Sequence, residues 1–339
     1  MTKSQATFAI FLLATIGFSN PADDLYTNSL KEFHHQNLTS ALKDINRAIE
    51  FNSTNAQFYY SRGLILYEQG NPEAAKDDYD RCIKIDPTAY KAYGNRGQIE
   101  THQNKLNTAI DDFTKGIALT NSPWLYIHRG IARDYKGTFN DALDDFDTAI
   151  TLMPNEGGAY ADRGVTKMHM GDTNVGLADF TRAIALAPLI AGNYVERGIV
   201  RRDTHDFIGA AADFNKAIQL KPHFSRAYNE RACLRVTVGD WRGATNDCAK
   251  AIELDQRFAE AFCTRGLAEV IGRDFQRAWA DYRHALEIRP DYALCFVNLG
   301  ILDAKMGDAK ASDNDFRKAV ELDPEMLSKI RAEGYSIKQ

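Results

Sequence analysis

The sequence lacks the short motifs that mark the common classes of enzyme. It contains no GxxxxGK[ST] phosphate-binding loop, no HExxH zinc helix and no GxSxG nucleophile turn. Its five cysteines form no CxxC pair, which argues against a disulfide framework and against a zinc site. The adjacent His34 and His35 would point in different directions on a helix, which is poor geometry for a metal. We therefore expect no catalytic residue, no metal site and no cofactor.

The chain also lacks an excess of positive charge. It has 41 lysines and arginines against 46 acidic residues, a net charge of -5 over 339 residues. A surface for nucleic acid usually needs a basic excess, so we expect no nucleic-acid partner. Hydrophobic residues make up 44% of the chain and charged residues 26%, which is ordinary for a folded protein with a sizeable core.

No apolar run reaches the length of a membrane span, but a shorter one lies at the N-terminus. Lys3 precedes a 13-residue apolar run over 6–18, and the small residues Gly17 and Ser19 stand at −3 and −1 of a possible cleavage after Ser19. This order is typical of a signal peptide, whereas a span needs about 20 apolar residues. We expect residues 1–19 to be removed and the mature chain to be secreted, or periplasmic in a bacterium, with no membrane span. A buried first helix and an uncleaved membrane anchor are the alternatives.

The rest of the chain repeats one unit. An Arg-Gly pair, or a close variant of it, returns every 33 or 34 residues from Arg62-Gly63 onward, and such a period indicates a solenoid. Counting the small residue of the pair as position 8 predicts nine repeats over 22–326, the first of them weak. The predicted repeats are 22–55, 56–89, 90–122, 123–156, 157–190, 191–224, 225–258, 259–292 and 293–326.

Each repeat predicts two helices and a turn. An aromatic residue at position 4 and the small residue at position 8 share one face of a first helix. Small residues at positions 20 and 27 and an aromatic at position 24 share one face of a second helix, which a proline at position 32 ends. Near position 15 stand residues suited to a left-handed turn: Gly70, Asn104, Gly137, Gly171, Gly239, Gly272 and Gly307.

This pattern resembles the tetratricopeptide repeat family, over nearly the whole chain after residue 22. The resemblance implies an all-α fold, a right-handed solenoid whose first helices line a concave groove. It also implies a scaffold that binds protein or peptide segments. Residues 327–339 cannot form a tenth repeat, and we expect them to form a capping helix and tail, with Leu327 and Ile330 on its apolar face.

The chain departs from the family at position 7, where arginine replaces the usual leucine. Aspartate recurs in step at position 23, so we predict a ladder of charge-assisted hydrogen bonds between the two helices. The spacing allows pairing within a repeat or with the next one, and we favour the former. An anion or metal site is less favoured, since a site does not normally recur in every repeat. The ladder residues are Arg62, Arg96, Arg129, Arg163, Arg197, Arg231, Arg265, Asp78, Asp112, Asp145, Asp179, Asp213, Asp247 and Asp281.

By the same resemblance, positions 2, 5, 9, 12 and 13 face the groove. Some members of the family bind the terminal carboxylate of a chaperone tail with a set of lysines and asparagines at fixed positions. This chain lacks that set, so we expect apolar anchors instead. At positions 5 and 9, packing between neighbouring first helices is the favoured alternative. Cys233 and Cys263 are the best candidates for a disulfide near this groove, although two free thiols are favoured. The predicted groove residues are Tyr60, Tyr67, Trp124, Ile127, Ile131, Tyr135, Met168, Arg202 and Arg226.

Three functions compete. A non-catalytic scaffold for proteins is favoured, because the repeats leave no room for a catalytic domain. An enzyme that uses the solenoid as its substrate channel is the second, and a subunit that serves a larger enzyme complex is the third. The sequence identifies neither the partner nor the oligomeric state.

Overall fold

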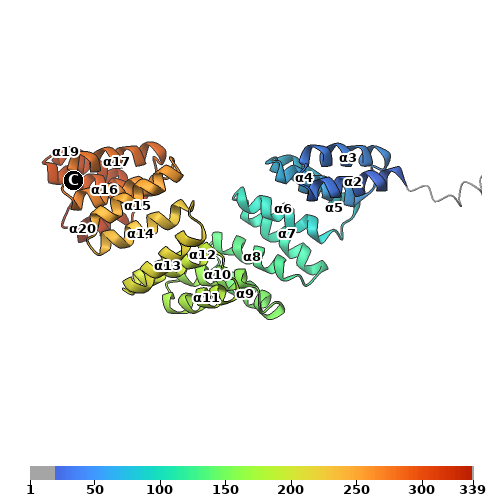
Figure 1. The fold of residues 1–339 in the computed structure, drawn as a ribbon, viewed down its shortest axis with the longest axis horizontal. Helices are drawn as coiled ribbons and strands as arrows, with labels where there is room; N and C mark the ends of the chain where they lie inside the picture. The colour runs from blue at the N-terminus through green and yellow to red at the C-terminus, as the bar shows by residue number, and fades with distance from the viewer. Residues whose placement is uncertain (1–19, 338–339) are drawn as a thin grey trace, which may run out of the picture. The chain divides into compact units, whose positions relative to one another are not determined.

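In a computed structural model, residues 20–337 are described, and the predicted signal segment 1–19 lies outside them. The described residues form nineteen helices and no strand, which confirms the all-α solenoid (Figure 1). The helices are α2 (Pro21–His34), α3 (Leu38–Phe51), α4 (Ala56–Glu68), α5 (Pro72–Ile85), α6 (Tyr90–His102), α7 (Leu106–Leu119), α8 (Pro123–Tyr135), α9 (Phe139–Leu152), α10 (Gly157–His169), α11 (Thr173–Leu186), α12 (Ala191–Asp203), α13 (Phe207–Leu220), α14 (Ser225–Thr237), α15 (Trp241–Leu254), α16 (Ala259–Ile271), α17 (Phe275–Ile288), α18 (Ala293–Met306), α19 (Ala309–Leu322) and α20 (Met326–Ala332).

The helices fall into two compact parts, which divide between Pro154 and Asn155. The N-terminal half holds α2 to α9, and the C-terminal half holds α10 to α20. Within each half every helix packs against the next one along the chain. Even-numbered helices from α2 to α18 are the first helices of the repeats, and odd-numbered helices are the second ones.

Small residues allow the two helices of a repeat to pack closely. A Cβ atom on Gly198 of α12 would lie 2.6 Å from the ring of Phe214 on α13, so only glycine fits there. Ala210 and Ala217 flank that ring on α13 and are fully buried. Close packing of this kind is sensitive to a single added methyl group, which explains the small side chains at positions 8, 20 and 27.

The turn between the two helices needs one residue with positive φ. Glycine supplies it at Gly239 (φ 80), but Asn104, His205 and Arg273 supply it elsewhere (φ 58, 65 and 64). The expectation for Gly272 is wrong, because its φ is -73 and the left-handed residue is the next one, Arg273. The residue with positive φ therefore stands at position 15 in each of these repeats, but it is glycine in some of them and a residue with a side chain in others.

The last helix, α20, packs on the ninth repeat. Ile330 is fully buried and Met326 nearly so, and both contact the cluster around Phe316. The Tyr335 ring lies 5.5 Å from the Phe316 ring. Met326 and Ile330 thus form the buried face, whereas Leu327, which the sequence placed on it, is half-buried.

Candidate functional site

The seven arginines at position 7 all bind an aspartate of their own repeat. Each guanidinium donates through two nitrogens to the aspartate 16 residues later. All seven aspartates are buried, and hydrogen bonds to them raise the pKa of Arg62, Arg231 and Arg265. The shortest N–O distances are 2.5–2.7 Å in Arg62–Asp78, Arg96–Asp112, Arg129–Asp145, Arg163–Asp179, Arg197–Asp213, Arg231–Asp247 and Arg265–Asp281.

A second cation joins the ladder in the fourth to seventh repeats, from position 11. Arg201 Nη1 donates to Asp213 Oδ2 at 2.8 Å, beside the two bonds from Arg197. Arg133, Lys167 and Arg235 act in the same way on Asp145, Asp179 and Asp247. Each of these four carboxylates is therefore paired with two cations of its own repeat. The ladder is a structural element that joins the helices of a repeat.

The aromatic residue at position 4 also belongs to this element. The guanidinium of Arg197 lies 5.8 Å from the centroid of the Tyr194 ring, and the Arg163 guanidinium lies 5.4 Å from that of Tyr160. Such cation–π contacts give each arginine a second partner besides its carboxylate. The same contact occurs in Arg62–Tyr59, Arg96–Tyr93, Arg129–Tyr126, Arg231–Tyr228 and Arg265–Phe262.

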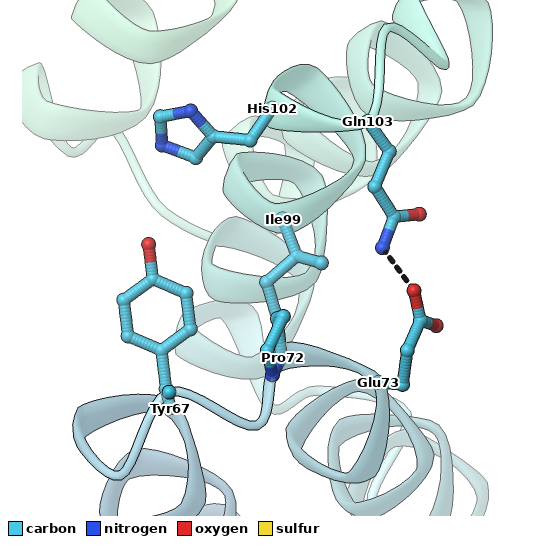
Figure 2. Close-up of a pocket in the computed structure, with 7 residues that line it drawn as sticks. Tyr67, Pro72, Glu73, Ile99, His102 and Gln103 are labelled. Carbon is cyan, nitrogen blue, oxygen red and sulfur yellow. Dashed lines mark hydrogen bonds between the residues drawn. The ribbon is translucent and has the colours of Figure 1, made fainter. Parts of the chain in front are cut away.

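A cavity of about 580 Å³ in the N-terminal half lies between α4, α5 and α6. Tyr67 and Ile99 form part of its wall, and Figure 2 shows the Tyr67 hydroxyl on the same side as the His102 ring. On the other side Gln103 Nε2 donates to Glu73 Oε1 at 2.7 Å. Tyr67 is the predicted groove residue here; Ile99 and His102 were not predicted.

Tyr60 contributes to a second cavity, of about 420 Å³, together with Tyr90 and Lys91. Its hydroxyl accepts a hydrogen bond from Asn95 Nδ2 at 3.4 Å, and burial raises the pKa of Tyr60. Tyr60 is half-buried and stays a phenol at neutral pH. It offers an apolar ring with one hydroxyl group at the junction of the second and third repeats.

Helix α8 presents the most exposed aromatic residues of the predicted set. Trp124 is 37% exposed and Tyr135 is 65% exposed, whereas Ile127 and Ile131 are half-buried. The Trp124 ring meets His128 edge-on at 4.2 Å, and burial lowers the pKa of His128 to about 4, so this imidazole is neutral at pH 7. The imidazole that meets the Trp124 ring therefore carries no charge at pH 7.

The predicted residues of the C-terminal half are engaged in contacts between helices. Arg202 Nη1 donates to Glu230 Oε2 at 2.9 Å, and Arg226 Nη1 donates to Glu196 Oε1 at 2.5 Å. Both pairs join α12 to α14, so these arginines stabilise the stacking of repeats. Met168 is half-buried, and its Cγ would lie 3.3 Å from a Cβ on Gly176 of α11.

A cavity of about 410 Å³ lies beside the Arg202–Glu230 pair. Asn229 lines it and is only 4% exposed, and its Oδ1 has no hydrogen-bond partner. Cys263 lines it too, and Asn298 Nδ2 donates to the Cys263 sulfur at 3.4 Å. Asn229 was missed because it stands at position 5, which is not polar in the other repeats. Asn298 was missed because it stands at position 6, which is polar in every repeat and therefore singles out no one residue.

Residues 20–337 contain no group of three or more metal-ligating side chains with suitable geometry. None of the helices in this range combines the length and the apolar character that a membrane span needs.

Two kinds of comparison identify the fold. The tetratricopeptide repeat family models match residues 56–89 and 294–326, which correspond to the second and ninth predicted repeats. No curated protein is similar enough in sequence to count as a relative.

Solved structures resemble the chain over most of its length. A tetratricopeptide repeat protein from Parabacteroides merdae is 18% identical, with a TM-score of 0.60, 73% of this chain covered and 98% of that one. A chain of the APC/C hetero-tetramer Cut9–Hcn1 is 12% identical, with a TM-score of 0.64, 98% of this chain covered and 82% of that one. PilW, a type IV pilus biogenesis factor, is 15% identical with a TM-score of 0.57, with 62% of this chain and 97% of that one covered. The chain thus folds as a solenoid of tetratricopeptide-type helix pairs, an architecture that commonly mediates protein interactions and is generally non-catalytic.

Proposed function

We propose that the chain is a non-catalytic scaffold that binds a peptide or protein segment against the first helices of its repeats. The observation that carries the proposal is the surface of the N-terminal half, where the Tyr67 cavity of about 580 Å³ and the exposed Trp124 and Tyr135 lie on first helices. Aromatic side chains around a cavity are the usual anchors of a protein interface, and they lose little conformational entropy when they bind.

Charge supports an apolar anchor rather than an ionic one. The imidazole of His128, which meets the Trp124 ring, is neutral at pH 7. We therefore expect the partner to supply apolar or aromatic side chains to the Tyr67 cavity and to Trp124.

A peptide selection tests this proposal. The full chain is used to select from a random peptide library displayed on phage, and binding of the enriched peptides is measured by fluorescence anisotropy. Tyr67→Ala and Trp124→Ala should each weaken binding by about tenfold or more, the size expected for an interface anchor. The matched control is Phe51→Ala, which removes a 60% exposed aromatic residue from the second helix α3 and should bind like the wild type. If the Tyr67 and Trp124 variants fold and bind with unchanged affinity, this surface is not the site.

We also propose that the mature protein works outside the cytoplasm. The support is the order of Lys3, the apolar run over 6–18 and the small residues Gly17 and Ser19. N-terminal sequencing of the native protein should return a chain that begins near Asn20. A chain that begins at Met1 or Thr2 would reject the proposal.

A further inference from the structure

The 410 Å³ cavity of the C-terminal half has an unsatisfied hydrogen-bond acceptor among its lining residues. Asn229, on the first helix α14, lines the cavity and is only 4% exposed. Its Nδ2 lies 3.9 Å from the sulfur of Cys233, while its Oδ1 has no hydrogen-bond partner among the described residues. A buried acceptor without a partner costs stability, and a ligand that donates to Oδ1 would recover this cost.

A second carboxamide also lines the cavity. Asn298, on α18, donates through Nδ2 to the sulfur of Cys263 at 3.4 Å. Cys233 and Cys263 are both free thiols. The nitrogen of each asparagine is thus turned to a sulfur atom, and the oxygen is the atom left to bind a ligand. The cavity therefore favours a ligand that carries two hydrogen-bond donors.

The charged groups that line this cavity, all within the described part of the chain, are already paired. They are Arg202, Glu230 and Glu260. Arg202 pairs with Glu230, and Glu260 accepts a hydrogen bond from Arg289 Nη1 at 2.6 Å. A charged ligand would lose its hydration in the cavity without gaining a free counter-charge, so the cavity favours a neutral ligand.

Arg202 keeps one donor for an acceptor atom of such a ligand. Its Nε donates to Asp203 Oδ1 at 3.0 Å and its Nη1 to Glu230 Oε2 at 2.9 Å, which leaves Nη2. The apolar lining residues are Val236, Leu267 and Leu294. Two acceptors, one donor and apolar side chains match a primary carboxamide on a methylene chain, whose NH₂ group donates twice and whose oxygen accepts. A main-chain amide has a single N–H and would leave one asparagine oxygen without a donor.

We infer that this cavity binds the glutamine side chain of a protein segment. Glutamine fits better than asparagine, because its second methylene group adds contact with the apolar lining residues. The volume lies within the range of ligand pockets, about 300–1,000 Å³, so a glutamine enters together with part of the chain that bears it. The inference deepens the proposed function and rests on it in one respect, since the glutamine is assigned to the partner segment.

Binding of small probes to the full chain tests the inference. The probe is N-acetyl-glutamine methylamide, and its dissociation constant is measured by ligand-observed NMR. The matched probe is the γ-methyl ester of N-acetyl-glutamate methylamide, which keeps the side-chain carbonyl but has no side-chain N–H. We expect the glutamine probe to bind at least about tenfold more tightly, because the ester leaves both asparagine oxygens without a donor. Equal binding of the two probes, or no binding of the glutamine probe, would overturn the inference.

The Asn229→Leu variant separates ligand binding from a structural role of Asn229. Leucine has a similar size and removes the unpartnered oxygen, so the variant should be at least as stable as the wild type in urea unfolding. It should bind the glutamine probe about tenfold more weakly. The matched control is Asn314→Ala, which changes an exposed asparagine of the second helix α19 and should bind like the wild type.

A second variant keeps the test decisive if Asn229→Leu does not fold. Asn298→Ala should weaken binding of the glutamine probe by a similar factor, because it removes the other acceptor. Unchanged binding in a folded Asn229→Leu or Asn298→Ala variant would show that the asparagines serve only the packing of their helices, and the inference would fail.

Free glutamine distinguishes the two sources of the side chain. The free amino acid carries an α-ammonium and an α-carboxylate group, for which the cavity offers no unpaired charge, so it should bind more weakly than the blocked probe. Tighter binding of free glutamine would overturn the assignment to a protein segment. The blocked probe needs no partner segment, so a failure of the peptide selection at Tyr67 and Trp124 would leave this result standing.

Discussion

The sixth and ninth repeats place an aspartate at the same position and give it opposite surroundings. Asp213 in the sixth repeat accepts hydrogen bonds from Arg197 and Arg201 at 2.7–2.9 Å. In the ninth repeat the arginine is replaced by Leu299 and the second cation by Asp303, so Asp315 shares a hydrogen bond with another carboxyl group. Burial and this neighbour raise the pKa of Asp315 to about 7, although Arg283 opposes the shift.

The repeat pattern thus fixes where the carboxyl group lies but not its protonation state. Two cations keep Asp213 in an ion pair. The buried Asp303 and the half-buried Asp315 cannot both ionise at low cost, so they retain a proton between them. The ladder therefore depends on positions 7 and 23, since it forms in the second, third and eighth repeats without a cation at position 11. It is lost in the ninth repeat, where leucine stands at position 7.

The largest effect is expected for Asp213→Ala. This change leaves the guanidinium groups of Arg197 and Arg201 without their carboxylate, and breaking one partner of a buried ion pair costs about 3–5 kcal/mol. Urea unfolding of the full chain, followed by circular dichroism, measures the loss. Asp111→Ala is the matched control, because Asp111 pairs with Lys115 on the surface and its loss should cost less than about 1 kcal/mol. Equal effects of the two changes would show that burial does not strengthen the ladder.

A smaller effect is expected for Leu299→Arg, which gives Asp315 the partner that other repeats have. In the wild type the folded chain holds a proton on Asp315 that the unfolded chain releases near pH 4. Stability therefore falls as pH rises from about 4 to 7, and it is greatest below that range. The free energy of unfolding should therefore fall less between pH 5 and pH 8 in the variant, by roughly 1–2 kcal/mol. Urea unfolding at the two pH values measures this difference. A pH dependence identical to that of the wild type would contradict the comparison.

Glu269→Gln should remove a further part of the same pH dependence. Glu269 stands at position 11 of the eighth repeat, its Oε2 has no partner, and burial and the charge of Asp281 raise its pKa to about 7. Since the carboxyl group is protonated at pH 5, glutamine should change little there and stabilise the chain by about 1 kcal/mol at pH 8. The matched control is Glu100→Gln, in the third repeat, where Lys76 lies 3.3 Å from the carboxylate. If Glu100→Gln stabilised the chain at pH 8 as much as Glu269→Gln does, the missing cation beside Glu269 would not be the cause of the gain in stability.

The sequence predicted much of the fold because its signals are local and periodic. A small residue at position 8 and an aromatic residue at position 24 recur with the same period. Their sizes predict that the two helices approach closely there, as Gly198 and Phe214 do. The bond from Asn298 to the Cys263 sulfur was not predicted, because it joins position 6 of one repeat to position 5 of the repeat before, and the pattern within one repeat does not show contacts between repeats. The ion pairs of Arg202 and Arg226 were missed for the same reason: a pattern shows which side faces a groove, but not which neighbour binds the charge.

The smallest effect is expected at the turn of the eighth repeat. Arg273 has a φ of 64, whereas Gly239 in the preceding repeat occupies the corresponding conformation with a φ of 80. A left-handed conformation costs a residue with a Cβ atom roughly 1–2 kcal/mol, and glycine avoids this cost but gains entropy in the unfolded chain. Arg273→Gly should therefore stabilise the chain by only about 0.5 kcal/mol, measured by urea unfolding. Gly239→Arg, the reverse exchange, should destabilise it by a similar amount, because a Cβ on Gly239 would meet nothing within 4 Å and only backbone strain acts. Changes of the same sign in both variants would show that contacts of the side chain, rather than the backbone, decide the residue at this turn.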